Sequence, residues 1–178
     1  MLPIRELLPF ESNRTHRHPA WLDDDDLLAA CDQKRLRRGG PGGQNRNKVE
    51  TAVRLEHRET GTVAEANEHR TQRENRHVAL RRLRLKLALA VRTPPLDYPH
   101  WAEVVAGRKV QATAHARTGP QLVAHVLNVC DAVAFDLAAA ARLLGVSKSQ
   151  VVKFLREDRT VMTALNERLR EHGRPTVK

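Results

Sequence analysis

The sequence predicts an α+β fold: a small domain with a short sheet, a β-hairpin and one long packed helix, followed by an all-α, helix-turn-helix-like C-terminal region. Residues 48–57 alternate between apolar and polar side chains, and a turn signal at 59–61 brings the chain back, as in a β-hairpin. Thr71 and Glu74 have the spacing of a capping box at the start of a long helical pattern. After TPPLDYP at 93–99 the pattern is helical.

The first domain begins with a short helix and a strand. Trp21 to Ala30 predicts a helix that Asp23 caps, and the aspartates that follow suit the positive end of the helix dipole. Cys31 to Arg38 predicts a strand that leads into a glycine-rich loop. The next strand has two faces, and Thr62 to Ala66 forms the second arm of its hairpin. One face carries Val49, Thr51, Val53 and Leu55, and the other carries Glu50, Ala52, Arg54 and Glu56.

The long helix extends from the capping box to about Val91. Its apolar stripe packs on the domain, and basic side chains occupy the remaining positions. The stripe consists of Val78, Leu80, Leu83 and Leu87, and the basic set of Arg76, Arg81, Arg82, Arg84 and Lys86.

Four helices are predicted in the C-terminal region, at about 119–130, 135–144, 148–157 and 161–172. The second and third fit a helix-turn-helix, in which Ser147 caps the later helix. The residues that carry this pattern are Ala141, Leu144, Gly145, Val146, Val151 and Phe154. Many such units only pack, so sequence-specific DNA reading is the less favoured role. We therefore expect an N-terminal extension (1–20), a first domain (21–92), a linker (93–118) and a helical region (119–178).

Charge indicates the kind of partner. The 178 residues have a net charge of +10, and residues 31–92 alone hold 16 Lys and Arg against 7 Asp and Glu, a net +9. A basic excess concentrated around the glycine loop favours a polyanion such as nucleic acid. Aromatic residues make up only 3 %, so stacking platforms for single-stranded bases are not expected.

The sequence shows no pattern typical of a membrane, secreted or metal-binding protein. No run of about 18 apolar residues and no secretory signal pattern occurs, so we expect a cytoplasmic protein without a membrane helix. Cys31 and Cys130 are far apart and form no CxxC, which favours buried thiols in a reducing compartment. No His, Cys and carboxylate spacing resembles a metal cage, so neither a metal nor a cofactor is expected.

The loop GGPGGQNRNK at 39–48 limits the chemistry. It is not a Walker loop, because Lys48 follows Asn47 and precedes Val49, and it leads into a strand rather than the helix of a dinucleotide site. It contains no Ser, Thr or Cys nucleophile. Gly42 and Gly43 can adopt conformations with φ > 0 and bring backbone N–H groups and the Gln44 amide into a crowded site. Because that amide does not titrate, the loop is suited to positioning a water molecule and stabilising an oxyanion or leaving group.

The loop resembles a known motif. Gly40-Pro41-Gly42-Gly43-Gln44 is similar to the GGQ motif of class I peptide-chain release factors and of related codon-independent ribosome-rescue hydrolases. The similarity covers roughly residues 20–92. It continues through Asn47-Lys48, TAVRL (51–55), HRETGTV (57–63), Arg70-Thr71-Gln72 and Asn75.

The resemblance implies an enzyme that hydrolyses the ester of peptidyl-tRNA in the ribosomal peptidyl transferase centre. Gln44 would orient the hydrolytic water with its backbone N–H serving the transition state, and Gly42 and Gly43 would permit that geometry. The implied partners are large-subunit rRNA and peptidyl-tRNA. Arg70, Gln72 and Asn75 would brace the loop or contact rRNA. The full set of implied RNA-binding residues is Arg37, Arg38, Arg46, Asn47, Lys48, Arg70, Gln72, Arg73 and Asn75.

The absence of a Pro-x-Thr or Ser-Pro-Phe tripeptide of the kind that reads stop codons leads us to expect codon-independent ribosome rescue. The alternative is a non-catalytic module that binds rRNA, tRNA or DNA in ribosome assembly or regulation. In that case function would depend on Arg, Lys and salt rather than on Gln44. A third interpretation makes the loop an ordinary connection. The role of 93–178, the type of stall, methylation of Gln44 and the oligomeric state stay open.

Overall fold

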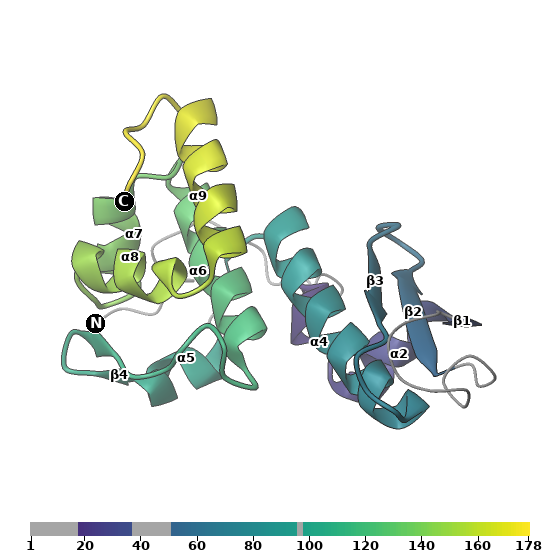
Figure 1. Cartoon of the computed structure of the whole chain (residues 1–178). Helices are drawn as coiled ribbons and strands as arrows, with labels where there is room; N and C mark the ends of the chain where they lie inside the picture. The colour runs from purple at the N-terminus through teal and green to yellow at the C-terminus, as the bar shows by residue number, and fades with distance from the viewer. Residues whose placement is uncertain (1–17, 37–50, 96–97) are drawn as a thin grey trace. The chain divides into compact units, whose positions relative to one another are not determined.

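A computed structural model describes residues 18–36, 51–95 and 98–178, which divide into two units (Figure 1). We call Pro19–Leu87 the sheet unit, and Ala88–Lys178 together with His18 the helical unit. The division falls inside one long helix, so it differs from the predicted end of the first domain at residue 92. The predicted domain boundaries therefore remain a proposal.

The sheet unit combines a three-stranded antiparallel sheet with one long helix, as the α+β prediction required (Figure 1). Its elements are η1 (Pro19–Trp21), α2 (Asp24–Ala29), β1 (Cys31–Leu36), β2 (Ala52–His57), β3 (Val63–Ala66) and α4 (Gln72–Ala90).

The central strand of the sheet is β2, and both of its neighbours run antiparallel to it. The pairs with β1 extend from Cys31↔His57 to Leu36↔Ala52, and the β2–β3 pairs begin at Val53↔Ala66. From Val53 to Glu56 the predicted alternation is confirmed, because Val53 and Leu55 are fully buried whereas Arg54 and Glu56 are half-exposed; Ala52, predicted on the polar face, is buried instead. The buried face packs with apolar residues of α4: Ala79, Leu80, Leu83 and Leu87.

Both predicted helix caps of the sheet unit are confirmed. The Asp23 carboxylate accepts the backbone N–H of Asp26 at 2.8 Å at the start of α2. The Thr71 hydroxyl accepts the N–H of Glu74 at 3.2 Å and donates to the Glu74 carboxylate at 2.7 Å. These contacts satisfy N–H groups that a helix start otherwise leaves without partners, so the chain changes direction at defined residues.

Arg84 differs from the other basic residues of α4, because its side chain is buried inside the sheet unit. It donates to the carbonyls of Ala20 and Leu22 and, at 2.6 Å, to the carboxylate of Asp24. Lys86 also bonds to the sheet unit, donating to the Val63 carbonyl at 2.7 Å. The placement of Arg84 outside the packed stripe was therefore wrong.

The helical unit is all-α apart from one short hairpin (Figure 1). The segment predicted as a linker, 93–118, contains a helix and this hairpin. The elements are α5 (Pro99–Val104), β4 (Val105–Ala106), β5 (Lys109–Val110), α6 (Gly119–Ala132), α7 (Leu137–Leu143), α8 (Lys148–Arg156) and α9 (Arg159–Glu171).

The core of the helical unit is α6, which is buried at nearly every position from Gly119 to Cys130. Gly119 is required there, because a Cβ at this residue would lie 2.0 Å from the carbonyl oxygen of Ala114. Beside α6, the buried Trp101 of α5 donates its indole N–H to the Leu144 carbonyl at 3.0 Å. His125 packs between the rings of Trp101 and Tyr98, and burial lowers the pKa of its imidazole to about 4.

The four predicted helices of this unit are confirmed, with two shifted starts: α9 begins at Arg159, two residues before the predicted start, and α7 begins later than predicted. Ala134 and Phe135 have φ angles of 48° and 55°, so the chain is left-handed where the pattern predicted the first turn of a helix. The next residue, Asp136, caps α7 by accepting two backbone N–H groups at 3.0 Å. Helix α7 therefore begins at Leu137 rather than at Phe135.

Helices α7 and α8 are joined by the turn that the sequence predicted. Gly145 lies in the turn with a φ of 71°, which favours glycine. Ser147 caps α8 by accepting the N–H of Gln150 at 3.3 Å. The apolar residues of the pattern are all buried: Ala141, Leu144, Val146, Val151 and Phe154.

Within the described ranges no single helix has the length and apolar character needed to cross a membrane, although α6 and α7, bent by 119° at their junction, reach that length and composition together.

Candidate functional site

The glycine loop is attached at one end of the sheet. Leu36, the last residue of β1, pairs with Ala52, the first residue of β2, so the chain leaves and re-enters the sheet at neighbouring positions. The predicted residues between these strands lie outside the described residues. They are Gly42, Gly43 and Gln44 of the catalytic set and Arg37, Arg38, Arg46, Asn47 and Lys48 of the RNA-binding set.

The start of α4 lies at the same end of the sheet. Ala66 ends β3 and pairs with Val53, next to the Leu36–Ala52 pair, and residues 67–71 lead from there into the helix. The fold thus brings the remaining predicted RNA-binding residues to the base of the loop. Arg70 and Arg73 are exposed, Gln72 is half-buried and Asn75 is buried.

Asn75 connects the returning end of the loop to the segment before α4. Its amide group donates to the carbonyl of Thr51 at 2.8 Å and to that of His69 at 3.0 Å, and its oxygen accepts the N–H of His69 at 2.9 Å. The side chain has 0 % exposure, so nucleic acid cannot reach it without local opening. Its contacts support the bracing role that the resemblance implied, and we propose that Asn75 positions the loop rather than contacts RNA.

Next to the hydrogen bonds of Asn75, the capping box formed by Thr71 and Glu74 stabilises the first turn of α4. The hydrogen bond from the Thr71 hydroxyl lowers the pKa of the Glu74 carboxyl, which therefore stays ionised at neutral pH. Its negative charge faces the positive end of the helix dipole. Gln72 and Arg73, which follow Thr71 directly, therefore occupy a rigid turn.

Three arginines at this end of the sheet unit have no carboxylate partner among the described residues. Arg70, Arg73 and Arg76 are exposed, and none of them forms an ion pair with another described residue. The nearby carboxylates are already paired: Glu65 with Arg54 at 3.1 Å and Glu68 with Arg82 at 2.6 Å. The surface beside the loop thus retains positive charge that suits phosphates.

Two arginines connect elements of this unit, a role that the sequence analysis assigned to neither of them. Arg84, described above, lies four residues after Leu80 and three before Leu87, so helical spacing already placed it on the apolar side of α4. Arg58 donates to the carbonyl of Cys31 at 3.0 Å and to the Asp32 carboxylate at 3.3 Å. Arg58 lies in the HRETGTV segment that resembles the family, but local spacing does not predict its contacts, because its partners lie 26 and 27 residues away in sequence.

Known proteins match one part of the chain, which extends from the sheet unit past its boundary at Leu87. A family model described as the RF-1 domain matches residues 29–98, which contain the loop, the sheet and α4. This chain carries a domain of the class I release-factor family. The RF-1 domain starts at the last residue of α2 and ends before α5, so most of the helical unit lies outside it.

Curated relatives bear the names of release factors. The chain is 55 % identical to peptide chain release factor 1 of Chlorobaculum tepidum over 52 residues, covering 29 % of this chain and 15 % of the relative. It is 30 % identical to peptide chain release factor 2 of Wolinella succinogenes over 119 residues, covering 58 % and 32 %. It is 55 % identical to the chloroplastic factor PrfB1 of Arabidopsis thaliana over 51 residues, covering 29 % and 11 %.

The chain thus spans at most about a third of the length of these relatives. No solved structure matches it.

Proposed function

We propose that this protein hydrolyses the ester of peptidyl-tRNA in the ribosomal peptidyl transferase centre, acting in the cytoplasm without reading a codon. The observation that carries the proposal is the Gly42-Gly43-Gln44 sequence inside an RF-1 domain, on a loop whose two ends are adjacent in the sheet. Arg70, Arg73 and Arg76, which form no ion pair with another described residue and lie near the start of α4, suit an rRNA-lined site.

The reaction adds water to the ester carbonyl and breaks the bond between the acyl carbon and the ribose oxygen. That oxygen takes up a proton, and the products are a peptide acid and a tRNA hydroxyl. Gln44 cannot remove the proton, since an amide does not titrate, so its contribution is to orient the water and to donate to the developing charge. Such a contribution requires a defined loop position, which Asn75 supports at the loop base through the Thr51 carbonyl.

Codon-independent action is favoured by the content of the chain. None of its 178 residues forms either tripeptide type associated with reading stop codons. The part outside the RF-1 domain is instead the helical unit, with a basic face on α8. For these 178 residues we therefore propose ribosome rescue, which the dependence of release on a stop codon tests.

The test is release of labelled peptide from ribosomes stalled at the end of a truncated mRNA. Wild type should release peptide, and Gln44→Ala should slow release by about 100-fold to 1,000-fold, the range typical of losing one transition-state donor. Gln33→Ala is the matched control, because Gln33 is an exposed glutamine on β1 of the same unit. Its release rate should equal that of wild type.

Three outcomes would contradict the proposal. Release only with a stop codon in the decoding site would assign the protein to termination. Equal loss in Gln44→Ala and Gln33→Ala would remove Gln44 from the chemistry. Ribosome binding without release by wild type would leave the alternative, a non-catalytic rRNA- or tRNA-binding module.

A further inference from the structure

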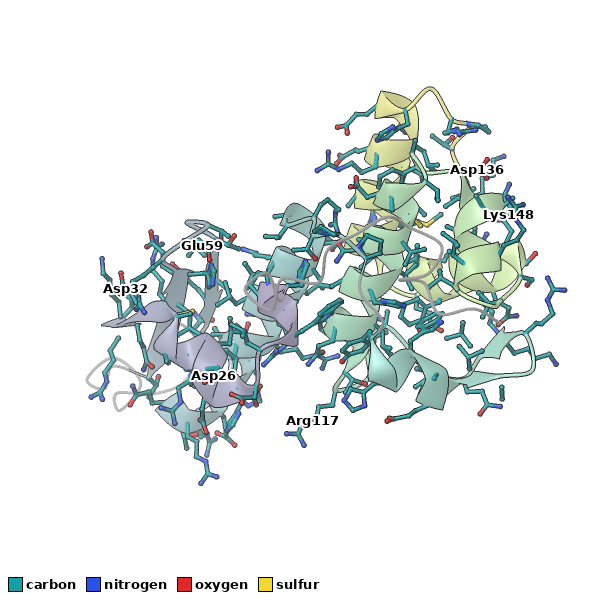
Figure 2. The ribbon with its side chains drawn as sticks, turned by 180° about the vertical axis from the view of Figure 1, so that it is seen from behind. Asp26, Asp32, Glu59, Arg117, Asp136 and Lys148 are labelled. Atoms are coloured by element: carbon teal, nitrogen blue, oxygen red, sulfur yellow. The ribbon has the colours of Figure 1, made fainter. Side chains whose placement is uncertain are left out.

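The exposed side of α8 carries only basic and small polar or apolar side chains. Lys148, Lys153 and Arg156 are exposed at intervals of five and three residues, so they follow one side of the helix over about 12 Å. Val151, Phe154 and Leu155 anchor the opposite side in the core. Lys148 lies at the outer edge of the helical unit (Figure 2).

The C-terminal segment turns this side of α8 into a groove. Val177 exchanges two hydrogen bonds with the Asn166 side chain of α9, at 2.9 and 3.0 Å, and Arg156 donates to the Lys178 carbonyl. The resulting groove has a volume of about 530 Å³. Among the described residues its lining consists of Lys148, Ser149, Val152, Lys153, Arg156, Val177 and Lys178, and we call it the α8 groove.

The lining of the α8 groove does not resemble a small-molecule site. Such sites are lined mainly by apolar and aromatic side chains, whereas here four of seven lining residues are cations and none is aromatic. None of the seven side chains is acidic, so a ligand of several negative charges fits the chemistry better than a single anion. A nucleic-acid duplex presents about one phosphate charge per 1.7 Å of its axis, which matches a row of cations on a rigid helix.

The acidic residues near α8 are occupied elsewhere. The Glu157 carboxylate accepts the N–H of Ala114 at 2.8 Å, and Asp158 caps α9. Asp136 caps α7 and pairs with Arg174 at 3.7 Å, and Figure 2 shows it with Lys148 in the same unit. Neither Lys148 nor Lys153 forms an ion pair within the described part of the chain. Their charge is therefore available to a partner.

We infer that the α8 groove binds the phosphate backbone of structured RNA, as a second RNA contact separate from the RF-1 domain. The choice of RNA over DNA rests on the proposed function, because the same chain would then work on a ribosome. The contact positions the protein rather than reads sequence. Gln150, the amide side chain within α8, is held by the N–H of Val110 at 3.3 Å and is not free to reach base edges.

The test measures binding of the full-length protein to a fluorescein-labelled 16-base-pair RNA duplex by anisotropy between 50 and 200 mM KCl. The variant Lys148→Gln/Lys153→Gln/Arg156→Gln should lose about 10-fold or more in affinity at 100 mM KCl. The slope of log K against log salt should become shallower by about 3, since each lost phosphate contact removes about 0.9. Circular dichroism and the unfolding midpoint verify that the variant is folded.

The matched control removes the same charge from the same unit at other exposed positions: Arg142→Gln/Arg159→Gln/Arg170→Gln. Its affinity should change by less than about 2-fold. Equal losses in the two triple variants would overturn the inference, because net charge alone would then explain the binding. An unlabelled DNA duplex that competes as well as the RNA duplex would overturn RNA as the partner.

The inference and the proposed function fail separately. Gln44→Ala should leave RNA duplex binding unchanged, because the uncharged amide of Gln44 neutralises no phosphate. Loss of peptide release with intact α8-dependent binding would defeat only the hydrolase proposal. Intact release with α8-independent RNA binding would defeat only the inference.

Discussion

Asn75 provides the sharpest test of how the fold supports the loop. Its side chain is fully buried and makes three hydrogen bonds, to the carbonyls of Thr51 and His69 and from the N–H of His69. Asn75→Ala removes all three hydrogen bonds at once and leaves two carbonyls and one N–H without this partner. Because each such bond contributes about 1 kcal/mol and each buried group left unpaired costs about 1–3 kcal/mol, we expect the free energy of unfolding to fall by about 3 kcal/mol.

Asn75→Asp tests the same geometry with almost no change in shape. A carboxylate can accept the His69 N–H but repels the two carbonyls that now receive the amide hydrogens. Burial and these carbonyls favour the protonated acid, so the folded-state pKa of the new carboxyl rises above its unfolded value. The deficit relative to wild type is therefore full at pH 7 and shrinks as the pH is lowered toward 5.

Both variants are measured by urea unfolding and by amide hydrogen exchange at His69, whose N–H loses its acceptor in Asn75→Ala. Gln72→Ala, a half-buried residue in the first turn of α4, is the control and should stay within about 0.5 kcal/mol of wild type. The reasoning is refuted if Asn75→Ala stays within that same range, or if Asn75→Asp is as stable as wild type at pH 7.

Three further predictions concern stability. Arg84→Met should reduce the free energy of unfolding by about 3 kcal/mol, since it leaves two backbone carbonyls without a donor, whereas Asp24→Asn should cost under about 1 kcal/mol because Asp24 is half exposed; equal losses in urea unfolding would contradict this. Gly119→Ala should lower the stability by more than about 2 kcal/mol, because its Cβ would lie 2.0 Å from the Ala114 carbonyl, and an unchanged Tm would exclude that clash. Burial lowers the pKa of His125 from 6.5 to about 4, so the neutral ring contributes stability that is full above pH 6.5 and is lost as the pH falls from there through 4. His125→Phe should remove roughly 3 kcal/mol of this pH dependence of the unfolding free energy. An unaltered slope of unfolding free energy against pH would contradict this.

Local sequence patterns predicted most of the secondary structure. The hairpin, the capping box at Thr71 and the Ser147 cap each depend on residues within a few positions of one another, so spacing alone was sufficient. The start of α7 was predicted two residues too early. Phenylalanine rarely adopts a left-handed backbone, so nothing in the local sequence indicated that Phe135 would do so. The α+β class and the release-factor family followed from the same short patterns.

In the candidate site, too, some features were predictable from the sequence and others were not. Sequence alone pointed to Gly42, Gly43 and Gln44, because a nonreactive amide directly after two glycines suits few chemistries. The basic excess around the loop pointed to a polyanionic partner. Whether a polar side chain is buried and hydrogen-bonded or exposed and available to a partner depends on residues far away in the chain. Asn75 meets Thr51 across 24 residues and Arg84 meets Asp24 across 60.

The sequence by itself therefore determined the order of elements, the identity of the loop and the sign of the charge around it, since these are properties of neighbouring residues. Only the tertiary structure decided that Asn75 and Arg84 are interior, that the Glu157 carboxylate accepts the N–H of Ala114, and that a groove lined by cations results. The physical reason is that hydrogen-bond partners and burial are settled when distant segments pack, and a buried polar group is stable only where such a partner is brought to it.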